Sequence, residues 1–324
     1  MEIGIEIQQA DALKIRADVL VLKYAQELYS IESAVFSKLA IVHRGLEKKL
    51  PKPNDFLYLE SLDSLSADHV LFTGVVELPK FRYKEIRNFS LSSLKYLAKV
   101  KPGTEHICFT LHGVNYGLDE TEAFESEVGG MVEAMASGLY PSRLKRITIA
   151  EINEARAERL RLILTDLFPE DTFESETKSL ARRSMGTDRL SRAGINSEEK
   201  PLIFVAMPFD KKLDDVFHYG IRNAVNRAGY LCERADEVLF TGDILDLIKR
   251  RIRNASLVIA DLTTANPNVY LEVGYAWGLG IPTVLIAQDP QELKFDVKGQ
   301  KCIIYSGIRE LEEKLSHELI GLRK

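Results

Sequence analysis

Short apolar runs alternate with longer stretches of helical spacing along most of the chain. Residue runs with the length and β-branched content of buried strands occur at 17–22, 56–59, 69–73, 106–111 and 146–150. Segments with apolar residues three and four positions apart lie between and after them, at 31–42, 83–98, 120–137 and 153–167. This alternation predicts an α/β domain over residues 1–169.

The pattern is interrupted at 170–200 and resumes at Pro201. The interruption is rich in Ser, Glu and Arg, and its few apolar residues have no sustained period, so we predict a polar linker. Five further strand patterns follow, at 202–206, 230–233, 257–260, 283–286 and 301–305. Helical spacing separates these strands, which predicts a doubly wound, five-stranded parallel sheet with flavodoxin-like order over 201–324.

The composition fits two globular domains and excludes several kinds of partner. The chain has 324 residues, 45% of them hydrophobic, which is enough for two full cores. A formal charge of -5 gives no general attraction to nucleic acids or anionic membranes. The N-terminus lacks a signal-peptide pattern and no apolar run reaches the roughly 18 residues of a membrane span, so we expect a cytoplasmic protein. The three cysteines are far apart, and no Cys/His cluster suggests a metal site.

The sequence at 256–288 encodes a strand, a polar loop, a helix and a second strand almost without ambiguity. Asp261 ends the first strand. Asn266 suits the N-cap of the helix, and Pro267 suits its first position. Glu272 then lies about a turn and a half into the helix, as a carboxylate close to the carboxyl end of a predicted parallel strand.

The carboxyl ends of the first three strands of this domain bring three polar loops to one edge of the sheet, where open α/β sheets bind ligands. Glu272 is predicted to face this edge, because the other side of its helix, with Val269, Val273 and Ala276, suits packing on the sheet. Taken singly, each polar residue also has a structural explanation, as a turn cap, a surface ion pair or a solvated carboxylate. The residues predicted to bind substrate are Met207, Pro208, Phe209, Arg234, Asp236, Thr263, Asn268 and Tyr275.

One loop of the first domain has the composition of a ligand-binding loop. Gly113, Asn115 and Gly117 allow unusual backbone angles, and Asp119 with Glu122 forms a plausible capping box for the next helix. Such a loop between a strand and a helix N-terminus suits an anion or a phosphate. The alternative is an ordinary turn with a good cap, since acidic residues in the first helical turn disfavour a bound pyrophosphate.

Two motifs of the second domain, FVAMPFD and VIADLTTANPNVYLEVGYAWGLGIPTVLI, carry a family resemblance. They resemble the superfamily that joins TIR-like domains with nucleoside 2-deoxyribosyltransferases. The resemblance implies cleavage of N-glycosidic bonds, either of deoxynucleosides or of NAD. It also implies that Glu272 is the catalytic residue and that Asp261 helps to orient the sugar. The Asp-Gly pair frequent in deoxyribosyltransferases is Asp261-Leu262 in this chain, which favours the TIR-like branch.

A single carboxylate can suffice for this chemistry on NAD. Breaking an N-glycosidic bond develops an oxocarbenium-like centre, which a carboxylate can stabilise or trap covalently. Nicotinamide leaves NAD as a neutral base and needs no proton. We therefore predict NAD as a substrate, with no cofactor, and expect the helix N-terminus to keep Glu272 ionised. Phe209 and Trp277 are candidates to stack on a base.

Three segments of the first domain, ADVLVL, YGLDETEAFESEVGGMVEAM and LKRITIAEINEARAERL, carry a second resemblance. They resemble macro domains and the related N-terminal domain of leucine aminopeptidases. The Asn- and Gly-rich adenosine and ribose loops of typical ADP-ribose-binding macro domains are not found after Leu22. We therefore expect this domain to sense a nucleotide-derived ligand, or to have a structural role, rather than to hydrolyse ADP-ribose.

These features together favour a bacterial signalling or antiviral defence enzyme that cleaves NAD or a related nucleotide once its first domain binds a nucleotide-derived activator. TIR-like relatives are generally activated by assembly, so the resemblance also implies a homo-oligomer. Two alternatives remain. One is a nucleoside 2-deoxyribosyltransferase or nucleotide N-glycosidase in salvage, and the other is a catalytically silent nucleotide-binding module in which Glu272 only contacts a ribose.

Overall fold

The chain forms two compact units, and neither is continuous in sequence. The computed structural model describes residues 3–169, 186–234, 244–294, 297 and 299–322. Unit 1 consists of Met1–Gly113 and Glu120–Ser197, and unit 2 of Val114–Asp119 and Glu198–Lys324. A loop from inside the first predicted domain therefore belongs to the second unit.

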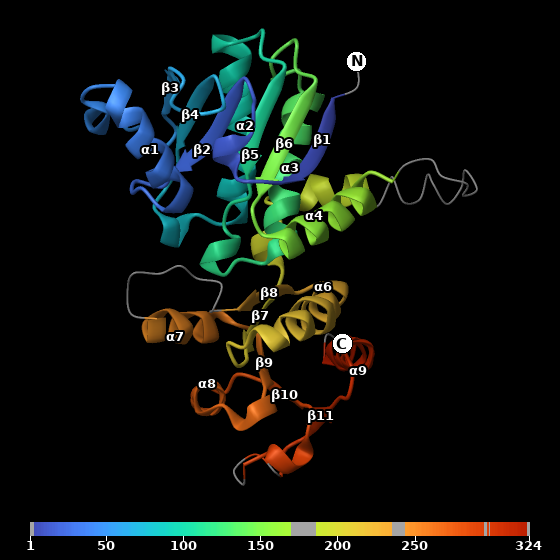
Figure 1. Cartoon of the computed structure of the whole chain (residues 1–324). Helices are drawn as coiled ribbons and strands as arrows, with labels where there is room; N and C mark the ends of the chain where they lie inside the picture. Colours follow the sequence, from blue (N-terminus) through green and yellow to red (C-terminus); the bar gives the residue numbers. More distant parts are fainter. Residues whose placement is uncertain (1–2, 170–185, 235–243, 295–296, 298, 323–324) are drawn as a thin grey trace. The chain divides into compact units, whose positions relative to one another are not determined.

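Unit 1 is built on a six-stranded mixed sheet with the strand order β1-β6-β5-β2-β4-β3 (Figure 1). β3 pairs antiparallel with β4, and the remaining pairs are parallel. After β2 the chain continues to β3 and β4 on one side of the sheet, and after β5 it continues to β6 on the other side. The strand order therefore reverses between the neighbouring strands β2 and β5. The strands are β1 (Gly4–Gln9), β2 (Val19–Tyr24), β3 (Phe56–Glu60), β4 (His69–Gly74), β5 (His106–Thr110) and β6 (Arg146–Glu151).

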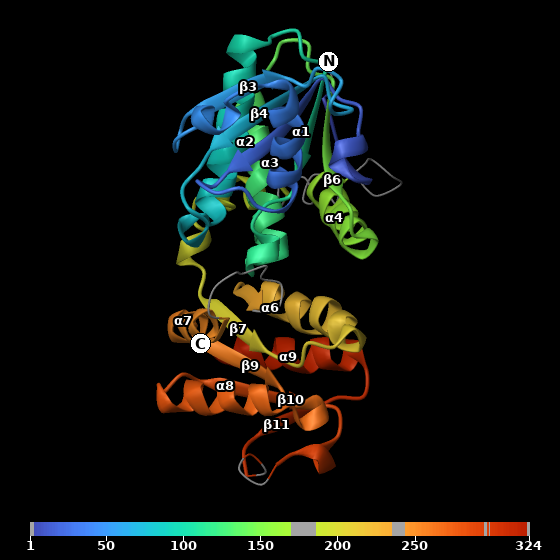
Figure 2. The same cartoon turned by 60° about the vertical axis from the view of Figure 1, so that its left-hand side comes forward.

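Helices cover both faces of this sheet (Figure 2). On one face, Leu39 of α1 belongs to the same buried core as Leu22 of β2. On the other face, Phe109 of β5 meets Phe89 of α2 edge to face, with ring centroids 6.0 Å apart. α2 packs along α3, and α4 lies beside β1. The helices are α1 (Ser30–Val42), α2 (Tyr83–Val100), α3 (Glu120–Ala136) and α4 (Glu154–Leu167).

Unit 2 is an all-parallel, five-stranded sheet with the order β11-β10-β9-β7-β8. This is the predicted flavodoxin-like order, with the first strand of the unit, β7, between the second and the third. The strand order reverses between β7 and β9, where Ala206 lies opposite Ala260. The strands are β7 (Leu202–Ala206), β8 (Leu231–Arg234), β9 (Leu257–Asp261), β10 (Thr283–Ala287) and β11 (Cys302–Ile304).

The two faces of this sheet carry separate cores. α7 (Ile244–Asn254) and α8 (Pro267–Gly278) cover one face, and Val269, Val273 and Ala276 of α8 are buried there as predicted. α9 (Ile308–Leu322) covers the other face together with the helical segment that follows β7.

The segment after β7, where helical spacing predicts an α-helix, is not one regular helix. It begins with the short turn Lys211–Leu213, continues as the π-helical stretch Val216–Arg222, and ends as α6 (Asn223–Arg227). π-helical stretches are rare and frequently mark functional sites. This one follows the first strand of the unit, beside the point where the strand order reverses.

The predicted linker at 170–200 differs from the structure over its later part. Residues 186–197 belong to unit 1, whereas 170–185 lie outside the described residues. Arg87 of α2 donates hydrogen bonds of 2.7 Å to the carbonyl oxygens of both Leu190 and Ala193, and both side chains are buried. The few apolar residues of 186–197 did not predict this packing, because the buried Arg87 side chain holds the segment through backbone carbonyl oxygens.

Several features are absent from the described parts of the chain. None of the helices in these ranges combines the length and the apolar character needed to cross a membrane. In the same residues, no three His, Cys, Asp or Glu side chains gather in a way that could hold a metal ion. The cysteines form no disulfide; Cys108 and Cys232 are buried and Cys302 is half-buried.

Candidate functional site

The candidate site of unit 2 lies at the carboxyl ends of β7 and β9, where the strand order reverses and open α/β sheets bind ligands. α8 follows β9 and starts as predicted. The side chain of Asn266 caps the helix by accepting a hydrogen bond of 2.9 Å from the backbone N–H of Asn268, and Pro267 occupies the first position. Asn266 and Pro267 thus determine where α8 begins, and therefore how far along the helix Glu272 lies from its N-terminus.

Glu272 lies on a partly buried side of α8. One helical turn further on, the hydroxyl of Tyr275 accepts a hydrogen bond of 3.0 Å from Arg253 of α7. The side of α8 that carries Tyr275 therefore borders α7, and Glu272 lies three residues before Tyr275 on the same helix. In the described residues, no hydrogen bond or ion pair reaches the Glu272 carboxyl.

Burial raises the pKa of Glu272 to about 7. Burial therefore outweighs the stabilisation of the carboxylate that was expected from the helix N-terminus. Glu272 is the sixth residue of α8, and the effect of a helix dipole fades within the first turn. A carboxyl that titrates near neutrality can act as an acid, a base or a nucleophile under physiological conditions.

Asp261 is fully buried and holds the loop before α8 in place. One carboxylate oxygen accepts hydrogen bonds from the backbone N–H of Thr263 at 3.0 Å and from its hydroxyl at 2.5 Å, and the other accepts from the hydroxyl of Tyr305 at 3.0 Å. Burial raises the pKa of Asp261, and these hydrogen bonds offset part of the rise. Asp261 is thus engaged within the protein, and its predicted role in catalysis stays a prediction. Thr263, predicted to bind substrate, is likewise buried and engaged with Asp261.

The loop held by Asp261 is strained. Thr264 and Ala265 adopt left-handed backbone angles, with φ of 67° and 50°. Non-glycine residues in such conformations cost about 1–3 kcal/mol each and tend to cluster at functional sites. The strain lies between the end of β9 and the start of α8, in the segment that sets the position of Glu272.

Two of the predicted substrate-binding residues, Met207 and Arg234, come together at the ends of β7 and β8. The Arg234 guanidinium lies 3.4 Å from the Met207 sulfur and 3.5 Å from an Asp214 carboxylate oxygen. Its central carbon lies 4.0 Å from the centroid of the Phe217 ring. No sequence pattern pointed to Phe217, because the π-helical geometry that directs it here cannot be deduced from a pattern of period 3.6.

The other predicted substrate-binding residues differ widely in exposure. Phe209 has 62% of its surface exposed, and Asn268 is also exposed. Pro208 is buried beside Met207. Asp236 lies outside the described residues. The two exposed side chains could contact a ligand directly, whereas Pro208 is available only to shape the loop.

The predicted ligand loop of the first domain needs its glycines. Gly113 and Gly117 have φ of 90° and 76°, which L side chains rarely adopt. Asn115 lies between them in the short turn Val114–Tyr116, and its side chain is outside the described residues.

The same loop is built into unit 2 through two contacts. The Asp119 carboxylate accepts a hydrogen bond of 2.9 Å from the backbone N–H of Cys232 in β8. The Arg251 side chain of α7 donates to the Tyr116 carbonyl oxygen at 3.0 Å and also pairs with Glu233. The loop therefore contacts the two residues that precede Arg234 in β8, either directly or through Arg251.

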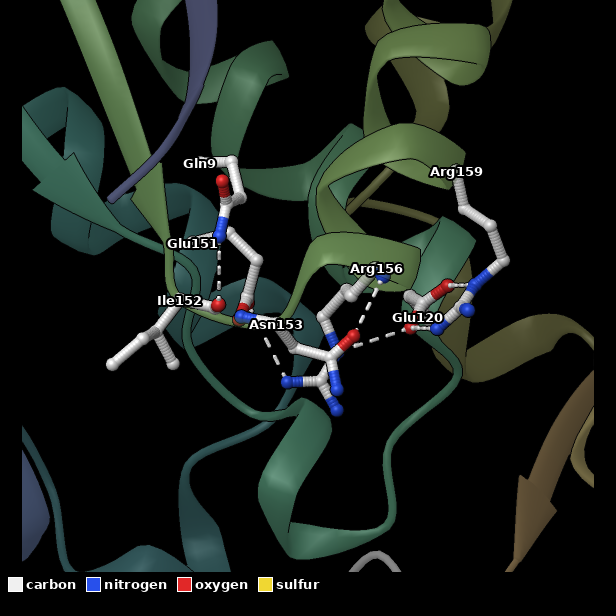
Figure 3. A network of polar contacts seen from close by, with 7 residues as sticks. All are labelled: Gln9, Glu120, Glu151, Ile152, Asn153, Arg156 and Arg159. Carbon is white, nitrogen blue, oxygen red and sulfur yellow. Dashed lines mark hydrogen bonds and ion pairs between the residues drawn. The ribbon is translucent and has the colours of Figure 1, made fainter. Parts of the chain in front are cut away.

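The residue after Asp119 is anchored in unit 1 (Figure 3). Glu120, the first residue of α3, is buried and accepts hydrogen bonds from Arg159 at 2.7 and 2.8 Å and from Arg156 at 3.2 Å. Asn153 caps α4 and so positions both arginines. Because two cations compensate the charge of Glu120, its repulsion of a phosphate at this helix terminus is weaker than the sequence suggested.

A second polar cluster lies in unit 1, where the strand order reverses between β2 and β5. Lys23 at the end of β2 pairs with Glu32 of α1, and both are buried. Burial, with the nearby Lys23 charge, lowers the pKa of His112 well below its usual value. Burial also raises the pKa of Glu127 on α3 to about 8. We did not predict this cluster, although a lysine that ends an apolar run was a usable signal.

Glu127 has no hydrogen-bond partner of normal geometry among the described residues for either carboxyl oxygen. The backbone N–H of His112 is close enough to lower the Glu127 pKa, but burial outweighs it. Burial therefore favours the neutral, protonated form of Glu127.

No family profile matches the chain, and no curated protein matches it. Part of the chain is similar to solved macrodomain structures. A Trypanosoma brucei macrodomain in complex with ADP is 16% identical over 50% of this chain and 68% of its own, with a TM-score of 0.39. An Oceanobacillus iheyensis macrodomain with ADP is 18% identical over 50% of this chain and 90% of its own, with a TM-score of 0.39. A mutant of that macrodomain with ADPR is 16% identical over 51% and 94%, also with a TM-score of 0.39.

Proposed function

We propose that unit 2 cleaves the N-glycosidic bond of NAD or a related nucleotide, with Glu272 as its catalytic residue. The observation that carries this proposal is a partly buried carboxyl with a pKa of about 7 on the helix that follows β9, one of the two strands between which the strand order reverses. The strained loop before α8 and the buried Asp261 add support, because both fix the position of Glu272. The sequence motifs around Glu272 supply the reaction class.

The proposed reaction needs one carboxylate and one water molecule. The bond between C1′ of the ribose and the nicotinamide nitrogen breaks, and its electron pair neutralises the pyridinium. The ionised Glu272 carboxylate stabilises the positive charge that develops at C1′. Water then adds to C1′, and Glu272, with a pKa near neutrality, accepts the proton that the water loses.

An assay of the full chain with NAD tests this proposal, with ADP and ADP-ribose as candidate activators. Release of nicotinamide supports it. Exchange of bases between deoxynucleosides without loss of NAD would contradict it and favour a salvage deoxyribosyltransferase. Tight nucleotide binding without turnover of either substrate would also contradict it and favour a silent binding module.

The rate of nicotinamide release should depend on pH through Glu272. Because burial raises its pKa to about 7, the reactive carboxylate is depleted below this pH and forms as the pH rises. We expect kcat/KM to increase about tenfold per pH unit below 7 and to level off above it. Initial rates between pH 5.5 and 8.5 check this prediction, and a rate that falls with rising pH through 7 would instead make Glu272 a proton donor.

We further propose that unit 1 binds a nucleotide and controls unit 2 through the loop Val114–Asp119. The loop carries Asn115 and Gly117, two of the three residues predicted to bind an anion, and its Asp119 and Tyr116 are hydrogen-bonded to β8 and α7 of unit 2. A ligand that reorders this loop would change the support of Arg234 at the end of β8. Assembly into a homo-oligomer stays a prediction, checked by light scattering with and without nucleotide.

Replacing Asp119 with alanine should weaken this control. The variant removes the hydrogen bond that the Asp119 carboxylate accepts from the buried backbone N–H of Cys232, at a cost of about 1–3 kcal/mol. We expect activation by ADP-ribose to fall about tenfold or more, measured as the ratio of rates with and without ligand. Asp188→Ala, which removes an exposed carboxylate from unit 1, is the control. An unchanged activation ratio in Asp119→Ala would rule out this route of control.

A further inference from the structure

Two arginines of unit 2 share one aromatic ring. The guanidinium carbons of Arg222 and Arg234 lie 4.7 and 4.0 Å from the centroid of the Phe217 ring. Both arginines are nearly buried, with 3% and 5% of their surfaces exposed. Stacking on an aromatic ring fixes the plane of a guanidinium and lowers the entropy it loses when it binds a ligand. Two planar groups with many N–H donors are thus held close together.

The location of this pair matches that of a ligand contact. Arg234 is the last residue of β8, and Phe217 and Arg222 belong to the π-helical stretch that follows β7. Arg234 lies opposite Val205, which lies opposite Ile259 of β9 in the adjacent pair of strands. β8 and β9 are therefore separated by two strand spacings, about 10 Å. α8 and the helical segment with Phe217 cover opposite faces of the sheet, so a nucleotide that contacts both must cross its carboxyl edge, with its sugar toward α8 and its phosphate toward β8.

The two guanidinium groups favour an oxyanion over a neutral ligand. Asp214, whose side chain is 47% exposed, places a carboxylate oxygen 3.5 Å from Arg234, so a bound anion competes with this carboxylate. The imidazole of His218 stands edge to face on the same Phe217 ring at 5.1 Å. Met207 contributes only a sulfur atom, a weak acceptor. Guanidinium groups bind phosphate with paired N–H donors, and a phosphate offers more oxygens to two such groups than a carboxylate does.

We propose that Arg222 and Arg234 recognise a phosphate group of the substrate, so that unit 2 acts on phosphorylated nucleotides and discriminates against nucleosides. The inference rests on the proposed N-glycosidase function and narrows its substrate class. It assigns a role to Arg222, which the sequence did not single out, and makes Phe217 the support of both arginines. It also disfavours free deoxynucleosides as substrates.

Binding of nicotinamide mononucleotide and of nicotinamide riboside tests the inference, because these probes differ only by the phosphate. Isothermal titration of the full-length Glu272→Gln protein measures affinity without turnover. We expect the mononucleotide to bind at least about 30-fold more tightly than the riboside, from one charge-assisted pair worth roughly 2 kcal/mol. Equal affinities would overturn the inference.

Two variants in the same background assign the effect to these residues. Arg234→Lys keeps the charge but loses the paired donors, and should weaken binding of the mononucleotide about tenfold while changing riboside binding less than twofold. Asp214→Asn removes a competing carboxylate at a half-exposed position that is safe for folding, and should tighten binding of the mononucleotide a few-fold. Arg309→Lys, on the exposed side of α9, is the matched control. If neither Arg234→Lys nor Asp214→Asn changes the affinity for the mononucleotide, the inference is overturned.

Failure of the inference is distinguishable from failure of the proposed function. Glu272-dependent release of nicotinamide from the riboside at the same rate as from the mononucleotide would overturn the phosphate contact and leave the N-glycosidase standing. Phosphate-dependent binding that responds to Arg234→Lys without any turnover would support the contact and contradict the N-glycosidase.

Discussion

Replacing Glu272 with glutamine is expected to lower kcat for nicotinamide release by about 10²–10⁴-fold, the range typical of a lost catalytic acid or base. Glutamine has nearly the same shape but cannot carry the negative charge that stabilises C1′ in the transition state. Affinity for NAD should change little, since the lost interaction is made mainly in the transition state. Initial rates and isothermal titration of the full chain measure the two effects separately.

Glu313→Gln is the matched control for this experiment. Glu313 lies on α9 with an exposed side chain and pairs with Arg309 one turn away. The pair is worth little at the surface, so neither kcat nor stability should change measurably. Glu272→Gln protein that keeps more than a tenth of the wild-type rate would show that another group supplies the charge.

Replacing Glu127 with glutamine is expected to stabilise unit 1 at alkaline pH. Burial raises the pKa of Glu127 to about 8 in the folded protein, far above that of an exposed glutamate. The stability that the neutral acid contributes is complete below its unfolded pKa and is lost as the pH rises toward 8. Glutamine does not titrate, so it avoids this loss, which reaches at most about 5 kcal/mol at roughly 1.4 kcal/mol per pKa unit.

Thermal unfolding of the full chain at pH 5 and pH 9 checks this second prediction. We expect the Tm of Glu127→Gln to exceed that of the wild type by several degrees at pH 9 and by much less at pH 5. Glu158→Gln, at an exposed position of α4, is the control and should leave the pH dependence unchanged. An equal shift at both pH values would mean that packing, and not ionisation, determines the effect.

The architecture of unit 2 could be predicted because its local signals agree with one another. Asn266 and Pro267 specify the start of α8, and Val269, Val273 and Ala276 specify the face that packs on the sheet. The ionisation state of Glu272 could not be obtained in this way. It depends on burial by residues distant in sequence, which outweighs the dipole of its own helix.

Other parts of the candidate site depend on geometry that has no sequence pattern. The π-helical stretch brings Phe217 beneath Arg234, whereas the sequence predicted a regular helix there. Asp261 has the residue type expected of a catalytic acid, but its hydrogen bond with Tyr305, 44 positions away, engages it within the protein. The loop Val114–Asp119 has the composition of a ligand loop, but nothing in its residues indicates that Asp119 would bond to Cys232.

The hydrogen bond between Asp119 and Cys232 also bears on how the protein avoids aggregation. β8 is the outermost strand of its sheet, and such strands can pair with strands of other molecules through their free backbone groups. Asp119 accepts a hydrogen bond from one of these backbone N–H groups, that of Cys232. Asp119 precedes Glu198, where the rest of unit 2 begins, by about 80 positions. During synthesis the protecting residue therefore leaves the ribosome before the strand it protects, so β8 need never be exposed without it. A fragment that starts at residue 198 would lack this hydrogen bond.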